Sequence, residues 1–345
     1  RPSGSDTVII APTQDSDVLR ERASEAGVPV RIVDLTRLTK HLPTLLRYLV
    51  RFPFEIAALA RLLRAEGVDL VHVNGAYQFK AALGARLSGA PVVWHLNDTM
   101  MPRPVRWAFR VTSKFCADGF IVAGERVRAY YLDPDVAGAR PVTEIHAPVD
   151  ITRFTPLPAV RDERGGGPLI GMVAHLNPTK GVEYFVEMAA KVAAMHPDAR
   201  FEVAGAELAS HRHYAEGLRA RAGELGLAPE RLRFVGSVRD VPAFLLRCHV
   251  CVFTSIAEAS PTAVWEALAS GRPVVTTDDG SVSRHIRHGE SGFVVPVGDV
   301  SALASCVSTL IRDPELCREV GLRARRHAER ELSLDSAAAA HLQFY

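Results

Sequence analysis

The sequence predicts an α/β protein of two doubly wound domains, each a parallel sheet with helices on both faces. Its 345 residues fit two domains better than one, and 48% of them are apolar, enough for two sizeable cores. Short β-rich runs also alternate with helical stretches along the whole chain. In such a fold, a ligand binds in the crevice at the carboxyl ends of the strands.

The β-rich runs fall into two groups, separated by a passage rich in Pro, Arg and Gly at 156–168. The first group comprises residues 7–11, 30–34, 69–74, 91–96, 119–124 and 143–147, with a long helical segment at 42–67. The second group comprises 169–174, 200–205, 231–236, 250–255, 272–277 and 292–297. We therefore expect an N-terminal domain at 1–155 and a C-terminal domain at 165–330.

The start of the chain is unusual. Residue 1 is Arg rather than Met, and no Gly-rich turn joins the first β-rich run to the helix after it. We expect that a preceding strand and helix of the first domain are missing from this sequence. No GxGxxG fingerprint follows any strand, which argues against a nicotinamide or flavin dehydrogenase.

Composition argues against several classes of protein. The 41 basic and 39 acidic residues leave a net charge of +2, so no nucleic-acid partner is required. Five cysteines suit a reducing compartment, and the apolar alternation around Cys248 and Cys251 favours a buried strand over a metal or redox pair. The apolar runs are shorter than the ~18 residues of a membrane span and no signal peptide is visible, so we predict a cytoplasmic protein.

One stretch, "EASPTAVWEALASGRPVV" at 258–275, predicts a helix with acidic residues around its start. Ser260 is a good N-cap, Pro261 suits the first helical position, and Gly271 marks a stop, so we expect a helix of roughly ten residues beginning at Pro261. Glu258 then lies in the loop before the helix and Glu266 on its body. The free N–H groups and positive dipole end of a helix start attract an anion such as phosphate.

A lysine marks a second loop. The chain has only five lysines, and Lys180 stands in "GMVAHLNPTKGVEYFVEMAA", where a strand runs into a turn and a helix begins. A cation at a helix start opposes the helix dipole, which makes sense if an anion binds there. The alternative is a solvated surface lysine at a loop tip.

With these features the chain closely resembles the GT4-type retaining glycosyltransferases of the GT-B fold. The stretches that carry the resemblance are "HLNPTKG" at 175–181, "RFVGSVRDVPAFLLRCHVCVFTS" at 233–255, the 258–275 segment and "HGESGFVVPVGD" at 288–299. They occur in the family's order and spacing over residues 168–325. The first domain matches more loosely, and the final segment, 333–345, resembles the closing helix that completes the first domain.

The resemblance implies roles for the residues around the 258–275 segment. Glu258 would hold hydroxyls of a donor sugar, and Glu266 would hold the ribose of its nucleotide. Ser260, Pro261, Thr262 and Ala263 would bind the diphosphate. The N–H groups of Thr262 and Ala263 would donate to it, whereas Pro261 has no N–H to donate. Lys180 would neutralise charge on the departing diphosphate.

The resemblance also implies more distant contacts. His95 in "WHLND" would approach the donor sugar, with a satisfied core histidine as the alternative reading, and Asn97 and Asp98 would meet the acceptor. The base would be recognised mostly through backbone at Gly236, Val238 and Arg239, so its identity is not revealed, and UDP is our default. The acceptor is a small molecule, a glycan or a lipid-linked sugar. No cofactor is implied, because the nucleotide-sugar is itself a substrate.

The sequence departs from the family pattern at several positions. His175 stands where the family carries Arg, so a phosphate contact there would depend on protonation. Ser281 and Arg284 replace the usual Gly and Glu, and "HAPVD" replaces an Asn-Gly turn at 147–148. We interpret Arg284 as a surface helix charge, with an anion or acceptor contact as the alternative.

Three rival interpretations stay open. The Asp-x-Asp triplets at 15–17 and 133–135 would suit a metal-dependent enzyme, but we interpret the first as a helix N-cap and the second as a helix-ending turn, and expect no metal. A nucleotide-sugar epimerase would use carboxylates as acid and base. A non-catalytic nucleotide-sugar binding protein is suggested by His175.

Two segments of the sequence also indicate a weak peripheral contact of the protein with a membrane. The segment at 102–115 and the helix near 43–64 mix cations with Trp, Phe and Leu, as interfacial helices do. A helix with one buried stripe in a doubly wound domain shows the same pattern.

Overall fold

The computed structural model describes residues 6–14, 16–39, 41–138, 140–156 and 166–345. By their contacts the residues divide into two compact units, Arg1–Trp94 with Trp107–Asp118 and His95–Arg106 with Gly119–Tyr345. The domain boundary expected between residues 155 and 165 falls largely outside the described residues and stays a prediction.

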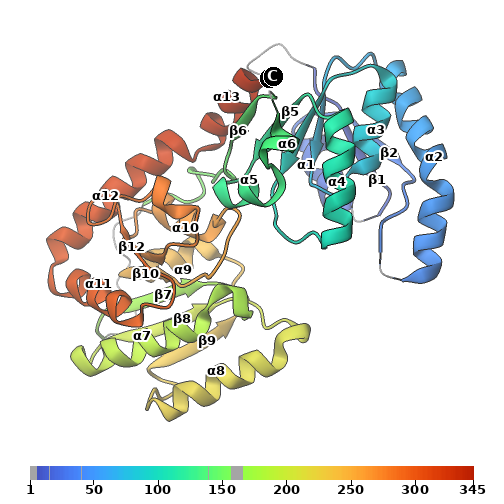
Figure 1. The fold of residues 1–345 in the computed structure, drawn as a ribbon. Coiled ribbons are helices and arrows are strands. Elements are labelled where there is room, and N and C mark those ends of the chain that lie inside the picture. Colours follow the sequence, from blue (N-terminus) through green and yellow to red (C-terminus); the bar gives the residue numbers. More distant parts are fainter. Residues whose placement is uncertain (1–5, 15, 40, 139, 157–165) are drawn as a thin grey trace. The chain divides into compact units, whose positions relative to one another are not determined.

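The second unit contains a six-stranded parallel sheet in the order β12-β11-β10-β7-β8-β9 (Figure 1). The strand order reverses between β7 and β10, where Ile170 pairs with Val250. The reversal is the doubly wound arrangement that the sequence predicts. The strands are β7 (Leu169–Val173), β8 (Arg200–Ala204), β9 (Leu232–Gly236), β10 (Val250–Phe253), β11 (Val274–Thr277) and β12 (Phe293–Val295).

Helices cover both faces of this sheet, because its strands are apolar on both sides. One core packs α7, α8 and α11 around the buried Phe185 and Phe201. The other packs α9, α10 and the C-terminal half of α12 around Trp265 and Phe244. The helices are α7 (Val182–Met195), α8 (Arg212–Glu224), α9 (Val241–Arg247), α10 (Thr262–Ala269), α11 (Val300–Arg312) and α12 (Pro314–Glu331).

Among the described residues, six further strands precede this sheet, and they are divided between two sheets. β1 and β2 form a parallel pair, and the other four lie in the order β3-β4-β5-β6. All twelve predicted strands are present, with ends that shift by a few residues. The strands are β1 (Ile9–Pro12), β2 (Val30–Val33), β3 (Val71–Asn74), β4 (Val92–Leu96), β5 (Gly119–Val122) and β6 (Val142–Glu144).

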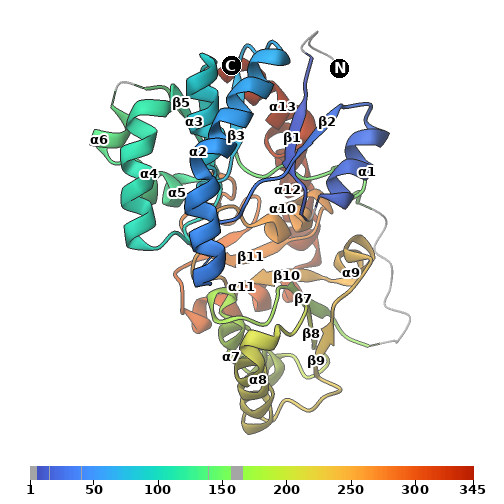
Figure 2. The same ribbon diagram turned by 90° about the vertical axis from the view of Figure 1, so that its right-hand side faces the viewer.

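The helices of the first half include the long helix predicted at 42–67, which is α2 (Leu42–Ala65). It packs against α3 so closely that a Cβ on Gly84 would lie 2.8 Å from the Leu59 Cβ. A buried ion pair, with 2.5 Å between Lys80 Nζ and Glu55 Oε2, joins the two helices. In Figure 2, α2, α3 and α4 lie on one side of strands β1–β3 and α1 on the other. The remaining helices are α1 (Asp17–Glu25), α3 (Phe79–Ser88), α4 (Arg103–Cys116), α5 (Glu125–Tyr131) and α6 (Pro134–Ala137).

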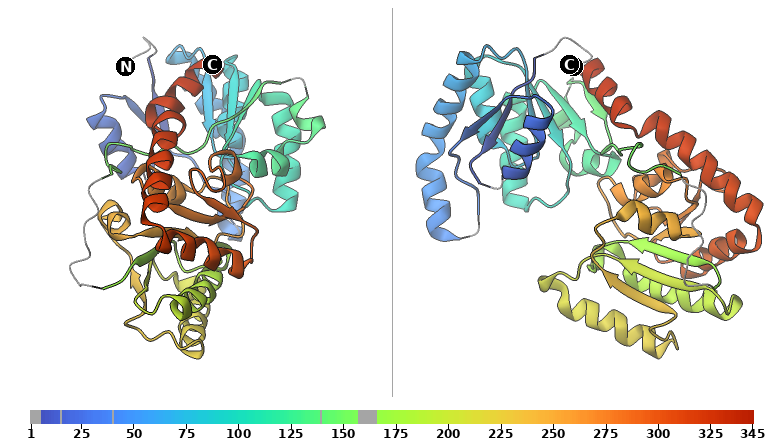
Figure 3. Two further views of the ribbon diagram at one scale, coloured as in Figure 1. Left: turned by 90° about the vertical axis from the view of Figure 1, so that its left-hand side faces the viewer. Right: turned by 180° about the vertical axis from the view of Figure 1, so that it is seen from behind.

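The chain closes with α13 (Leu334–Phe344), which follows α12 directly (Figure 3). The hydroxyl of Ser333 caps this helix by accepting from the Ser336 N–H at 3.1 Å. The ring of Phe344 contacts β5, because a Cβ on Gly119 would lie 3.0 Å from it. The helix predicted at 333–345 is therefore present. None of the helices in the described part of the chain is long and apolar enough to cross a bilayer.

The two cysteines of the CxxC motif are buried, as predicted. Cys251 lies on β10, and the Cys248 thiol donates to the Phe244 carbonyl at 3.3 Å. The neighbouring Cys251 and burial hold the pKa of Cys248 well above its usual value. Both cysteines therefore belong to the core.

Candidate active site

The strand order of the six-stranded sheet locates a candidate site. The chain leaves β7 toward β8 and leaves β10 toward β11, in opposite directions along the sheet. A crevice opens at the carboxyl ends of strands at such a reversal point. The loops that follow β7 and β10 carry Lys180 and Glu258, the two residues on which the sequence prediction depends most.

The loop after β7 is held by a side-chain cap. The Asn177 side chain accepts from the Lys180 N–H at 3.2 Å and from the Thr179 hydroxyl at 2.6 Å, which fixes a 3₁₀ turn over Pro178–Lys180. Gly181 follows with φ of 57°, and a Cβ there would lie 2.2 Å from the Thr254 carbonyl. Only glycine fits this approach. Lys180 thus lies in the turn, and α7 begins at Val182 rather than at about Lys180 as expected.

An ion pair joins the two loops. The Lys180 ammonium contacts Glu258 Oε1, and the Ser255 hydroxyl donates to the same oxygen at 2.8 Å. Ser255 is held in turn by Thr277, whose hydroxyl donates to the Ser255 carbonyl at 2.6 Å. The side chains of Lys180 and Glu258 are 27% and 15% exposed, so the pair is largely shielded but open on one side. The structure thus brings the two side chains together, and their roles in donor binding stay predictions.

The helix after Glu258 begins later than predicted. α10 covers Thr262–Ala269, eight residues rather than about ten, and its N-cap is Pro261. The Ser260 hydroxyl does not cap the helix: it accepts from Trp265 Nε1 at 3.1 Å and from the Ala147 N–H at 3.1 Å. The predicted Ser260 cap is therefore wrong, because these two tertiary partners take the hydroxyl.

Thr262 and Ala263, whose N–H groups were expected to bind phosphate, differ in their surroundings. The Thr262 N–H donates to the Ser260 carbonyl at 3.0 Å, and its side chain is exposed. Ala263 is partly exposed in the first turn of α10. Glu266, one turn further on, is partly buried, and burial raises its pKa while the charge of Arg153 opposes the shift.

A further carboxylate lies at the same edge of the sheet, and sequence reasoning missed it. Asp279 follows β11, the neighbour of β10, and is 3% exposed. It accepts from the Ser281 N–H at 3.0 Å and the Ser281 hydroxyl at 2.7 Å. Burial raises the pKa of Asp279, and the nearby charge of Glu258 adds to this shift. The Asp-Asp pair directly after a buried strand was the available signal.

Four other predicted donor contacts lie at the ends of β7 and β9. His175 is exposed after β7. Gly236 ends β9 with φ of 71°, and its carbonyl accepts from the Gly205 N–H at 2.8 Å. Val238 is partly buried and Arg239 exposed in the loop that follows. Their roles in donor binding stay predictions.

A cluster of histidines packs against α10. Sequence patterns did not predict this cluster. The His285 ring lies 5.0 Å from the Trp265 ring and 4.4 Å from the His146 ring, centroid to centroid. His285 Nδ1 is 3.0 Å from His327 Nε2. Burial is the main cause that lowers the pKa of His285, to about 3, and it also lowers the pKa of His327. We call these three histidines the histidine cluster.

An ion pair borders the histidine cluster. Arg284 contacts Glu144, and His146 Nε2 is 2.9 Å from the other oxygen of that carboxylate. Burial raises the pKa of Glu144, but the hydrogen bond from His146 and the charges of His146 and Arg284 outweigh it, so the net shift is downward. Arg284 ends a 3₁₀ helix and its side chain is 63% exposed, so it is a surface charge as interpreted, and the structure adds Glu144 as its partner.

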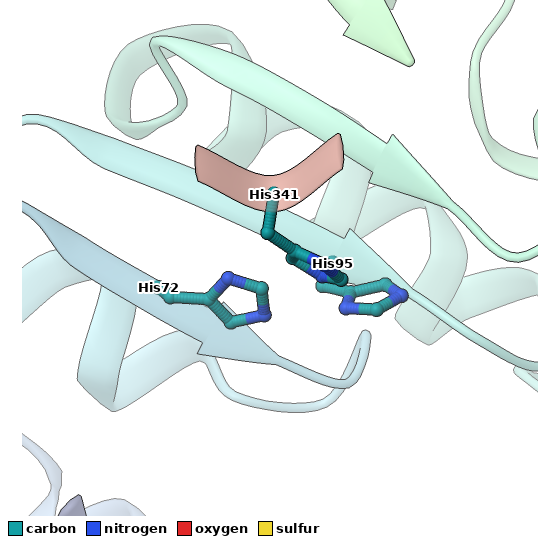
Figure 4. A group of neighbouring side chains, drawn as sticks. All are labelled: His72, His95 and His341. Carbon is teal, nitrogen blue, oxygen red and sulfur yellow. The ribbon is translucent and has the colours of Figure 1, made fainter. Parts of the chain in front are cut away.

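The residues predicted to meet the sugar and the acceptor lie on β4 and the loop after it. His95 is partly buried, and its ring centroid is 5.7 Å from that of His341 on α13 (Figure 4). Figure 4 also draws His72, a residue of β3 in the other unit. Asp98 accepts from the Met100 N–H at 2.9 Å and the Tyr131 hydroxyl at 3.2 Å, and Asn97 is exposed.

The described residues of the two Asp-x-Asp triplets lie at helix ends. Asp15 lies outside the described residues, and Ser16 precedes α1 without a side-chain cap. Asp133 follows α5 and begins the short helix α6 by accepting from the Val136 N–H at 3.0 Å. The second triplet is thus a helix start as well as a helix end, which corrects its interpretation as an ending turn alone.

Two family profiles match the chain. The profile described as glycosyl transferases group 1 matches residues 155–327, half of the chain, and the one described as Glycosyltransferase Family 4 matches residues 2–153. The chain therefore belongs to the glycosyl transferases group 1 family. This confirms the resemblance drawn from the motifs.

Individual relatives show how far the likeness extends. The chain is 31% identical over 205 residues to the lipopolysaccharide core biosynthesis mannosyltransferase LpcC of Rhizobium leguminosarum bv. viciae, a match covering 58% of each protein. It is 29% identical over 293 residues to a D-inositol 3-phosphate glycosyltransferase of Streptomyces scabiei, covering 81% of this chain and 63% of the relative. The chain thus spans less than two thirds of the length of these relatives.

Solved structures share the fold. HepE of Anabaena, solved in complex with UDP and glucose, superposes with a TM-score of 0.78 at 19% identity, covering 97% of this chain and 90% of HepE. The sucrose-phosphate synthase of Thermosynechococcus elongatus gives a TM-score of 0.72 at 19% identity, covering 98% and 97%. These likenesses confirm the GT-B fold with its two Rossmann-like domains.

Proposed function

We propose that the protein is a retaining glycosyltransferase that moves a sugar from a nucleotide-diphosphate donor, by preference a UDP-sugar, to an acceptor hydroxyl without a metal ion. The observation that carries the proposal is the Lys180–Glu258 pair at the reversal point of the six-stranded sheet. Membership of the glycosyl transferases group 1 family supports it, as does the UDP bound to HepE.

The ion pair supplies the two charges that a sugar diphosphate needs. Without donor, Lys180 and Glu258 satisfy each other. When the donor binds, the diphosphate takes the ammonium of Lys180, and the sugar hydroxyls take the carboxylate of Glu258. As the bond from the anomeric carbon to the phosphate oxygen breaks, negative charge grows on that oxygen. The fixed cation and the Ala263 N–H at the start of α10 stabilise this charge, whereas the Thr262 N–H already donates to the Ser260 carbonyl.

Other side chains would orient the rest of the donor. Glu266, one turn into α10, would bind the ribose, and the backbone from Gly236 to Arg239 would bind the base. His175 would approach the phosphates, and His95 the sugar. Asn97 would contact the acceptor, which is a small molecule, a glycan or a lipid-linked sugar.

The proton of the acceptor hydroxyl passes to the leaving phosphate oxygen on the same face of the sugar, which retains the anomeric configuration. This route needs no general base. Asp98 is the candidate base in the loop after β4, and it already accepts two hydrogen bonds. Lys180 supplies the positive charge that a metal ion would otherwise provide.

The first experiment identifies the nucleoside diphosphate that the protein binds. Thermal shifts with UDP, GDP and ADP identify the base, since a ligand at 100 times its dissociation constant stabilises by about 2.7 kcal/mol. The matching α-linked sugar donor is then incubated in EDTA with water as the acceptor, and NMR follows the first sugar released. We expect the α anomer first and unchanged rates in EDTA. Release of the β anomer, dependence on metal, an isomerised sugar or binding without turnover would each contradict the proposal.

Glu258 gives a specific check on the assignment. Glu258→Gln removes the charge but keeps the shape, and we expect loss of donor turnover with the thermal stability preserved. Glu290→Gln is the matched control, because Glu290 is an exposed glutamate in a loop of the same unit. Equal turnover in the two variants would remove Glu258 from the site.

A further inference from the structure

The outer face of α2 is apolar and exposed. Its exposed apolar side chains recur at the spacing of one helix face and are 55–71% exposed: Leu42, Leu46, Leu49, Val50 and Phe54. The opposite face of the helix buries Ile56, Leu59 and Leu63. Folding within the first unit therefore explains one apolar face of α2 and not the other. Contiguous apolar surface of this kind marks a docking site.

The exposed charges on the same helix are all positive. α2 contains four arginines, and its only acidic residue is Glu55. Glu55 is 4% exposed and is held by Lys80 and by the Thr36 N–H at 3.2 Å, so it presents no charge to the surface. Arg47 and Arg61 are exposed along the helix.

α4, a third helix of the same layer, repeats the pattern. Trp107 and Phe115 are 68% and 72% exposed, and Val111 between them is 39% exposed. The helix carries three arginines and Lys114, and no acidic residue. Figures 1 and 2 show α2, α3 and α4 side by side, on the side of strands β1–β3 away from α1. Two helices of one layer thus present apolar side chains together with cations.

The charges decide what covers this surface. A symmetric dimer through α2 would bring the same patch onto itself, so that arginines would face arginines with no exposed acid on either helix to pair with them. An anionic lipid surface supplies the opposite charge and accepts the Leu, Val, Phe and Trp side chains among its acyl chains.

We propose that the outer face of α2, flanked by α4, docks the protein on an anionic membrane surface. The contact would hold the first unit at the bilayer without using any side chain of the candidate active site. It is therefore a second function of the molecule, separable from sugar transfer.

Flotation with vesicles tests the proposal on the whole chain. We expect binding to vesicles of phosphatidylcholine mixed with phosphatidylglycerol, no binding to pure phosphatidylcholine, and weakening as salt is raised. Leu46→Glu with Leu49→Glu should weaken binding by at least about tenfold, because it places acids in the apolar face. Arg47→Glu should weaken it through charge alone.

Matched controls keep the result interpretable. Leu322→Glu changes a leucine that is 42% exposed on α12, in the other unit, and should leave vesicle binding unchanged. Thermal unfolding and the donor-induced thermal shift should be the same in all variants, so a failure of docking is distinct from a failure of donor binding. Absence of binding to anionic vesicles, or equal weakening by Leu322→Glu, would overturn the proposal. A concentration-dependent dimer that Leu49→Glu abolishes would also overturn it and assign the face to a second copy.

Discussion

The carboxyl edge of the six-stranded sheet and the outer face of α2 are both open to solvent, yet they are built in opposite ways. At the sheet edge, polar side chains hold one another: Lys180 contacts Glu258, which Ser255 also binds. On α2, exposed apolar side chains such as Leu49 and Phe54 stand among arginines. The first arrangement fixes a few groups for a small charged ligand. The second offers a broad surface to something extended.

The largest predicted effect is on sugar transfer, and it distinguishes the edge of the six-stranded sheet from the outer face of α2. Lys180→Ala should lower sugar transfer by about 10²–10³-fold, the usual cost of removing one group that stabilises developing charge. Lys191→Ala, an exposed lysine on α7, should leave the rate unchanged. Donor turnover with water as acceptor measures both. If Leu49→Glu lowered turnover as much as Lys180→Ala, the separation between the sheet edge and the α2 face would fail.

The close approach of the two loops predicts a loss of stability. Gly181→Ala places a Cβ 2.2 Å from the Thr254 carbonyl at φ of 57°, and should lower the free energy of unfolding by about 2 kcal/mol or more. The same substitution at Gly217, on the exposed side of α8 with open space around it, should raise it by about 0.5–1 kcal/mol. Urea unfolding gives both values. Equal effects would mean that the loops do not press together.

The histidine cluster behind the edge predicts sensitivity to acid. The pKa of His285 is about 3 when folded and about 6.5 when unfolded, so the unfolded chain binds more protons between these values. Stability should fall as the pH drops from 6.5 toward 3, by about 2 kcal/mol at pH 5 from His285 alone.

A pair of variants checks the source of this slope. His285→Phe should flatten the dependence of unfolding free energy on pH, although Glu144, Arg284 and His327 still surround the site. His213→Phe, at a fully exposed histidine on α8, should leave the slope as it is. An unchanged slope in His285→Phe would show that the cluster is not the source.

The smallest effect concerns Ser260. Ser260→Ala leaves the buried indole N–H of Trp265 and the Ala147 N–H without their acceptor, which should cost about 1–2 kcal/mol. Ser301→Ala, at an exposed serine of α11, should change stability by less than about 0.5 kcal/mol. Thermal unfolding distinguishes them. If the Ser260→Ala variant were as stable as the wild type, the two hydrogen bonds to this hydroxyl would not stabilise the fold.

The sequence predicted those features that local patterns determine. Each of the twelve strands overlaps one of the predicted β-rich runs, and all are present. Lys180 and Glu258 were assigned to loops after two strands, and the doubly wound order places those two strands side by side. Periodicity and family motifs were sufficient here because strand order follows from topology.

Features that depend on residues far apart in the chain were missed or misread. Ser260 has the local signature of a helix cap, but its hydroxyl is taken by Ala147, 113 positions away. The histidine cluster comes from three separate segments, each with a single unremarkable histidine. Arg284 has a surface-like context, and only the fold gives it Glu144 as a partner.

The affinity of the nucleoside diphosphate tests the central claim most directly. The best of UDP, GDP and ADP should be titrated by calorimetry into the wild type, Lys180→Ala and Lys191→Ala. A charge-assisted contact to the diphosphate predicts that Lys180→Ala weakens binding by about ten- to a hundredfold while Lys191→Ala does not. Binding of equal strength in all three proteins, or of none of the diphosphates to the wild type, would contradict the account.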